Sequence, residues 1–283
     1  MNHLRGLIVG LALFLESVCL VWGQAHPDFL KIGERNINQG VYGMPGRLTQ
    51  AEEEEQGAAI DALLHDQTQL SADPEVTAYL QSLAEAISSR SDFKGPLRVQ
   101  MGRNQRHLSF ATLAGYLYVY VELFKIAESE AELAGVLAHE IGHLAACHGA
   151  ENILRSRLLK EKPGHISALL APLLAIGGSE PVGDVESFWK AVRFSNEFEA
   201  DELATQYLWN ADFDPEGLLN FLGRVKDENR LDERHVSHPR VSHPPISIRR
   251  EKIQRFLEIL PPLPGVRTES PAFAEARNRL RPR

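Results

Sequence analysis

Cysteine is scarce in this sequence. Only Cys19 and Cys147 occur among 283 residues, which excludes a small disulfide-rich scaffold. Cys19 lies in an N-terminal segment that we expect to be removed, so Cys147 is the single cysteine of the expected mature chain. No internal disulfide can then form, even though export would permit one.

Basic residues are also fewer than acidic ones. The chain has 30 Lys and Arg residues against 38 Asp and Glu residues, a net charge of −8, and no basic stripe compensates for it. This balance argues against nucleic acids and anionic lipid surfaces as main partners, and favours polypeptides or small molecules. Hydrophobic residues make up 43% of the chain, which is enough for one ample core and excludes a disordered protein.

Long apolar runs are missing too. The N-terminal run Leu7–Leu15 follows a short basic start and stops at Glu16, well short of the roughly 20 residues that a membrane-spanning helix needs. Small residues at Gly23 and Ala25 then supply a cleavage pattern. We therefore predict a secretory signal peptide over residues 1–25, cleaved after Ala25.

The rest of the chain, residues 26–283, is expected to be one exported domain, periplasmic or associated with the cell envelope. An uncleaved anchor and lipidation of Cys19 are weaker alternatives. A second apolar run, Ile166–Ile176, has only 11 residues and cannot span a bilayer. We expect a hairpin that covers the core at residues 163–183, although membrane contact there is possible.

Helical patterns dominate this domain. Acidic Glu52–Glu55 suits a first helical turn, and Asp73-Pro74 ahead of apolar residues at 76, 80, 83 and 87 is typical of a capped amphipathic helix. The capping box Ser129–Glu132 opens a helix that we expect to continue to about Leu158. Further helices are expected over 185–209, from Asp214, over 246–260 and near the C-terminus.

Two segments have the pattern of β-strands, Leu97–Met101 and Tyr116–Val121. In the second, tyrosines alternate with Leu117, Val119 and Val121, the period typical of a strand with one packed face. Together with the helices, these strands predict an α+β fold that is mostly α with a small sheet. Its catalytic core would occupy about residues 75–260.

The sequence His139-Glu140-Ile141-Gly142-His143 carries the chemistry. Two histidines four apart on a helix lie about 40° apart around its axis, so both rings can reach one metal ion, and zinc is the expected one. Zinc with three protein ligands keeps a position for water and lowers the pKa of that water to about 7. Glu140 faces the metal side without being needed as a ligand, so its expected role is general base.

A third ligand is expected from the segment Glu197–Asp201. Glu197 and Asp201 share one helix face, so one carboxylate can bind the ion while the other holds an imidazole N–H. Glu199 points to the other side. Without the upstream histidines, this acidic cluster would be interpreted as a solvated helix face.

Other polar residues near these helices have roles apart from binding the ion or accepting its proton. Cys147 would lie about 12 Å along the helix axis from His139, too far to share the ion, and is expected to be a buried small hydrophobe. His148 falls off the metal face and is expected to support a ligand or the fold. His243 is a tentative catalytic residue: it either hydrogen-bonds the developing oxyanion or blocks the site at rest, and the alternative is a structural loop histidine.

These residues resemble the motifs of family 48 of the metallopeptidases, the HtpX-like and BepA-like gluzincins, and the resemblance covers most of the expected mature chain. It implies a zincin-type fold and one Zn²⁺ per chain. It also implies Glu140 as the base and Asp201 as the residue that orients His139 or donates a proton. The matching segments are Glu130–His143, Asn196–Asp201, Phe213–Gly217, Ser242–Pro245 with Arg249, and Ser270–Phe273 with Arg277 and Leu280. In this pattern the zinc ligands are His139, His143 and Glu197.

The chain departs from the family pattern in three places. The family often has arginine in place of Cys147 and Pro-Gly-Gly in place of Leu113–Gly115. We also expect the helical-repeat module of BepA-like proteins, which binds partners, to be absent.

The resemblance and the motifs predict a zinc endopeptidase that cleaves unfolded or misassembled envelope proteins. Its substrate would lie extended along the edge of the Tyr116–Val121 strand. One alternative is a zinc-bound chaperone that seldom cleaves, for which the intact Glu140 is unfavourable evidence. Another is an envelope-anchored assembly factor that uses the 163–183 hairpin.

Overall fold

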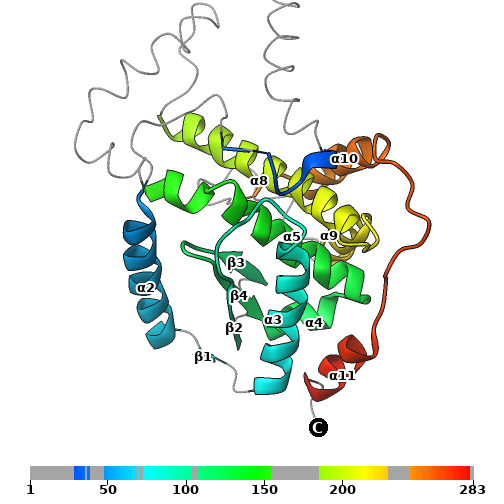
Figure 1. Ribbon diagram of the computed structural model, residues 1–283, viewed down its shortest axis with the longest axis horizontal. Coiled ribbons are helices and arrows are strands. Elements are labelled where there is room, and N and C mark those ends of the chain that lie inside the picture. Colours follow the sequence, from blue (N-terminus) through cyan, green and yellow to red (C-terminus); the bar gives the residue numbers. More distant parts are fainter. Residues whose placement is uncertain are drawn as a thin grey trace, which may run out of the picture.

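The computed structural model of the chain describes residues 29–35, 37–38, 48–67, 69–70, 73–103, 108–153, 185–228 and 243–280. Most of these residues are helical, and they surround a small sheet (Figure 1), as the sequence predicted. The elements are η1 (Phe29–Lys31), α2 (Gln50–Gln67), β1 (Gln69–Leu70), α3 (Pro74–Ser88), β2 (Arg98–Arg103), β3 (Ser109–Ala111), β4 (Tyr116–Tyr120), α4 (Val121–Ile126), α5 (Glu130–Ala145), α8 (Val185–Asn210), α9 (Gly217–Glu228), α10 (Ile246–Leu257) and α11 (Pro271–Leu280).

The expected signal peptide and the hairpin expected at 163–183 lie outside the described residues. Of the helices that are described, none combines the length and apolar character needed to cross a membrane.

Helix α3 begins as its sequence predicts. The Asp73 carboxylate accepts hydrogen bonds from the backbone N–H groups of Glu75 and Val76, and Pro74 occupies the first helical position. The four apolar positions that were predicted to share a face, Val76, Leu80, Leu83 and Ile87, are all buried. Helix α5 likewise starts at its capping box, where the Ser129 hydroxyl accepts from the Glu132 N–H at 3.1 Å.

Among the described residues, four strands form the sheet in the order β1-β2-β4-β3. Strand β4 is parallel to β2 and antiparallel to β3, so both of its edges are paired. The prediction that substrate lies along the edge of the Tyr116–Val121 strand is therefore wrong. The edge strand on this side of the sheet is β3, and β3 packs against α5.

Both faces of β4 are buried, not one as predicted. Leu117 and Val119 face the main core, whereas the Tyr118 hydroxyl on the other face donates to Asp61 of α2 at 2.5 Å. Tyr118 also stacks on Phe110 of β3 with ring centroids 4.8 Å apart. The sequence did not predict this second packed face because its contacts, Phe110 of β3 and Asp61 of α2, come from other elements.

The turn from β3 to β4 needs a left-handed backbone. Ala114 and Gly115 have φ values of 54° and 78°. A Cβ atom at Gly115 would come within 1.8 Å of the Pro96 carbonyl oxygen, so this position requires glycine. The glycine keeps β4 close enough to pair with β2.

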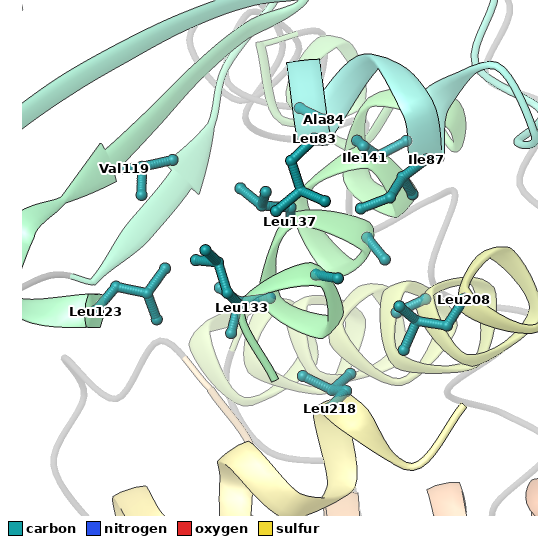
Figure 2. Packing of buried hydrophobic residues seen from close by; sticks show 14 of the residues in the cluster. Leu83, Ala84, Ile87, Val119, Leu123, Leu133, Leu137, Ile141, Leu208 and Leu218 are labelled. Carbon is teal, nitrogen blue, oxygen red and sulfur yellow. The ribbon is translucent and has the colours of Figure 1, made fainter. Parts of the chain in front are cut away.

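The core surrounds α5. Its residues Leu133, Leu137 and Ile141 pack against side chains from several other elements (Figure 2). The partners labelled there are Leu83, Ala84 and Ile87 of α3, Val119 of β4, Leu123 of α4, Leu208 of α8 and Leu218 of α9. Helix α5 is therefore the central helix of the described fold, and its polar residues are fixed by packing on several sides.

Helix α5 is shorter than predicted. It ends at Ala145, and helical backbone resumes at His148 and continues to Ile153. Cys147, between the two helical segments, has a φ of 58°, in the left-handed region. Neither residue of the break, Ala146 or Cys147, is a glycine or proline, so the helical pattern appeared to run on.

The start of α5 is joined to the C-terminal segment by the fully buried Glu130. Its carboxylate accepts hydrogen bonds from the Tyr79 hydroxyl (2.8 Å), the Arg267 guanidinium (2.8 Å) and the Ser270 hydroxyl (2.6 Å). Three donors, one of them charged, compensate the cost of burying this carboxylate.

Candidate metal centre

Helix α5 brings two imidazole rings together. His139 and His143 are one turn apart, and their Nε2 atoms lie 3.1 Å from each other. Every residue of α5 except His143 is buried, and the His143 side chain is 18% exposed. The two nitrogens therefore meet at a point where a buried helix reaches solvent.

Helix α8 supplies a carboxylate to the same point. The Glu197 oxygens lie 3.6 Å from His139 Nε2 and 3.5 Å from His143 Nε2. The two helices come this close because Gly142 has no side chain: a Cβ there would lie 3.1 Å from the Ala200 carbonyl oxygen, closer than ordinary contact. Residues more than 50 positions apart in the sequence thus converge.

The three side chains fit a zinc ion. His139, His143 and Glu197 each offer one ligand atom, and these atoms lie within 4.8 Å of one another. Tetrahedral zinc with bonds of about 2.0–2.2 Å holds its ligand atoms about 3.3–3.6 Å apart, close to the distances seen here. Glu197 Oε2 is buried and accepts no hydrogen bond from the described residues, an arrangement that a bound cation would compensate.

The charges around Glu197 also favour a carboxylate ligand. Burial by itself would raise the pKa of Glu197. The hydrogen bond with His139 and the charge of His143 have the larger, opposite effect and hold that pKa well below its usual range. Burial and the nearby His139 lower the pKa of His143, which keeps this ring neutral. A neutral imidazole and an ionised carboxylate are the forms that bind metal.

Asp201 and Arg249 hold His139 from behind. Asp201 Oδ1 lies 3.0 Å from His139 Nδ1, and Asp201 also accepts two hydrogen bonds from the Arg249 guanidinium, at 2.8 and 2.6 Å. Burial favours a neutral Asp201, but Arg249 outweighs it and lowers the pKa of the carboxyl. Burial likewise lowers the pKa of His139, whereas Asp201 and Glu197 raise it to about 9. At a pKa of about 9 the metal-free His139 ring is protonated on both nitrogens, so metal binding must displace the Nε2 proton, while the Asp201 contact retains the proton on Nδ1.

Glu140 lies beside the ligands but contacts the sheet. Its Oε1 accepts from the Ser109 hydroxyl at 2.7 Å, and its Oε2 accepts from the Ala111 backbone N–H at 2.9 Å. Burial raises the pKa of Glu140, although the charge of His139 and the Ser109 hydrogen bond offset part of this rise. Nothing in the sequence pointed to Ser109, because its position depends on how β3 pairs.

The model of peptidase family M48 matches residues 74–256, about two thirds of the chain, and the match includes every residue of this centre. The chain belongs to peptidase family M48.

Several relatives of this M48 chain are beta-barrel assembly-enhancing proteases. The one from Vibrio cholerae is 30% identical over 222 residues, which cover 73% of this chain and 44% of the relative. The one from Escherichia coli K12 is 28% identical over 229 residues, covering 77% of this chain and 47% of the relative. The chain thus spans less than half the length of these curated relatives.

The M48 chain also has a histidine that contacts His143 from the side away from the metal position. His148 Nδ1 lies 2.8 Å from His143 Nδ1, and His148 Nε2 lies 3.1 Å from Glu199 Oε2. His148 was expected to support a ligand or the fold, but on a continuous helix it would point elsewhere. Glu199 was set aside as facing away from the metal, and the structure shows its carboxylate against His148.

The remaining two candidates of this M48 centre differ in position. Cys147 is outside the metal-binding group of His139, His143 and Glu197 and packs against a small second apolar cluster that includes Leu113 and Ala150. His243 Nε2 lies 3.5 Å from Glu197 Oε2, with 54% of its side chain exposed. Cys147 thus packs against apolar side chains as expected, but it is partly exposed and not buried, whereas His243 is at the margin of the centre.

Proposed function

We propose that this M48 chain is a zinc-dependent endopeptidase with a zincin-type, gluzincin active site. The observation that carries the proposal is the convergence of His139 and His143 with Glu197 of α8, beside the buried Glu140. The proposed zinc ligands are these two histidines and Glu197, with one ion per chain. Bound zinc would lower the pKa of a water molecule and polarise the scissile carbonyl.

Within this site each of the following residues has a separate role. Glu140 accepts the proton of the attacking water and passes it to the leaving amine nitrogen. Asp201 keeps His139 in the tautomer whose Nε2 faces the ion, and Arg249 keeps Asp201 ionised. Ser109 and the Ala111 N–H fix the Glu140 carboxylate against β3.

We propose β3 as the strand beside which an extended substrate lies. It is one of the two edge strands of the described sheet, and its residues Ser109 and Ala111 contact the proposed base directly. Pairing through backbone groups would give affinity with little side-chain selectivity, which suits unfolded polypeptides. The names of the relatives and the predicted export signal support envelope proteins, unfolded or misassembled in the periplasm, as the substrates.

Removal of the metal tests this function. We expect the purified mature protein to contain about one zinc ion per chain and to cleave casein. A zinc chelator should abolish the cleavage, and added Zn²⁺ should restore it, because no protein group replaces the water-activating ion. Metal analysis and casein digestion measure both properties. Cleavage that survives complete loss of zinc would refute the proposal, whereas bound zinc without cleavage would favour the chaperone alternative.

His243 is proposed to cover the metal position at rest. Its exposed ring lies 3.5 Å from the Glu197 ligand oxygen, whereas the Glu197 side chain is only 11% exposed, so His243 is on the solvent side of the ligand. We therefore expect His243→Ala to raise casein cleavage severalfold and to leave zinc affinity unchanged. Lower cleavage would instead assign the ring to the oxyanion, and unchanged cleavage would remove His243 from the site.

A further inference from the structure

The break after α5 redirects a histidine. Along a continuous helix, the five residues from His143 to His148 turn the chain by about 500°, so the two side chains would point about 140° apart. Helix α5 instead ends at Ala145, and Cys147 has a left-handed backbone before helical structure resumes at His148. The chain therefore turns back, and the His148 ring returns to the level of His143.

The returned ring makes two polar contacts. His148 Nδ1 lies 2.8 Å from His143 Nδ1, with the two rings edge to face and their centroids 5.0 Å apart. On its other side, His148 Nε2 lies 3.1 Å from Glu199 Oε2. The His148 side chain is only 5% exposed and that of Glu199 is 29% exposed. Three side chains thus form a chain of contacts from α5 through the second helical segment to α8.

The proton positions in this chain follow from the metal site. His143 directs Nε2 at the ligand cluster, so in the metal-binding form its proton is on Nδ1 and that nitrogen is a donor. His148 Nδ1 must then be the acceptor. The proton of a neutral His148 is consequently on Nε2, where it is donated to the Glu199 carboxylate. One tautomer of each ring satisfies both contacts.

We propose that His148 and Glu199 are positioning residues for the zinc ligand His143. His148 accepts the His143 Nδ1–H and so fixes its tautomer and ring orientation, while Glu199 holds His148 in the accepting form. The inference rests on the proposed zinc site. It gives His143 a support of different composition from that of His139, which is held by Asp201 and Arg249.

The test measures zinc affinity of the mature protein by competition with a chromogenic chelator. Loss of a hydrogen-bond partner behind a ligand typically weakens metal binding by about 10- to 100-fold, and we expect this loss for His148→Ala. His148→Asn should recover most of the affinity, because the asparagine oxygen can occupy the place of Nδ1. Glu199→Ala should weaken binding less than His148→Ala, because it removes only the group that orients the acceptor.

Two measurements separate positioning from folding. The control Asn152→Ala changes an exposed residue of the same short helix and should keep wild-type zinc affinity. The metal-free His148→Ala protein should unfold at a temperature close to that of the metal-free wild type. The visible spectrum of the Co²⁺-substituted protein should change in His148→Ala and return toward the wild-type spectrum in His148→Asn.

The proposal is overturned if His148→Ala binds zinc within about twofold of the wild type, or if His148→Asn is as weak as His148→Ala. A metal-free His148→Ala protein that is already unfolded would also overturn it, since His148 would then support the fold. A wild-type protein that binds no zinc would refute the proposed function itself. The failures of the two proposals are thus distinguishable.

Discussion

Replacing Glu140 by glutamine should lower casein cleavage by about 10²- to 10⁴-fold, the usual contribution of a general base, without loss of zinc. The Glu140 carboxylate would be the proton acceptor, whereas His139, His143 and Glu197 hold the ion without it. Glutamine fits the same space. Its oxygen can accept the Ala111 N–H, and its NH₂ group can donate to the Ser109 hydroxyl oxygen, so the contact with β3 survives.

The comparison needs metal content and initial rates on the same samples. Glu258→Gln is the matched control, because Glu258 is an exposed carboxylate at the end of α10 and should keep wild-type cleavage. If Glu140→Gln and the wild type cleave at the same low rate, the chain is a zinc-bound chaperone or scaffold and not a peptidase.

Replacing Arg249 by leucine should lower the free energy of unfolding by about 3–5 kcal/mol, the range for removing one partner of a buried ion pair. Arg249 is buried and makes two hydrogen bonds to Asp201, which is 1% exposed. Leucine fills part of the volume but removes both guanidinium hydrogen bonds, so the Asp201 carboxylate keeps only its contact with His139 among the described residues. Urea denaturation of the metal-free proteins measures the loss.

Two further variants make this prediction specific. Arg255→Leu on the same helix removes an exposed ion pair with Glu251 and should change stability by less than about 1 kcal/mol. The double variant Arg249→Leu with Asp201→Asn should recover part of the loss, because the neutral amide is cheaper to bury than an unpaired carboxylate. Equal losses for Arg249→Leu and Arg255→Leu would show that the buried pair contributes no special stability.

Local patterns were sufficient to predict several elements. Helix α3 follows from Asp73-Pro74 and its apolar spacing, and the start of α5 follows from the capping box at Ser129. His139 and His143 of the candidate metal-binding group were also predictable from their spacing on one helix. In each case the signal lies within a few residues of the feature. The choice of Glu197 over Asp201 as the third member came from the family resemblance, because spacing left both open.

Features that depend on distant parts of the chain were not predictable. The sheet order places β4 between β2 and β3, and the sequence of β4 does not specify its neighbours. The position of Ser109 against Glu140 follows from that pairing. The break at Cys147 was not predicted for another reason. A non-glycine residue adopts a left-handed backbone there, and the local preference of such residues is against that conformation.

The buried Glu130 has a consequence for the order in which the protein folds. Its partners Arg267 and Ser270 are separated from it by 137 and 140 positions, among the longest separations of the side-chain contacts described here. In a chain that is made and exported from its N-terminus, both histidines and Glu197 arrive well before these partners. Until they arrive, the first turn of α5 holds a carboxylate that is costly to bury. Stable folding of α5 is thereby coupled to the presence of residues 267–270, so a product truncated before them would be poorly suited to form the candidate metal centre.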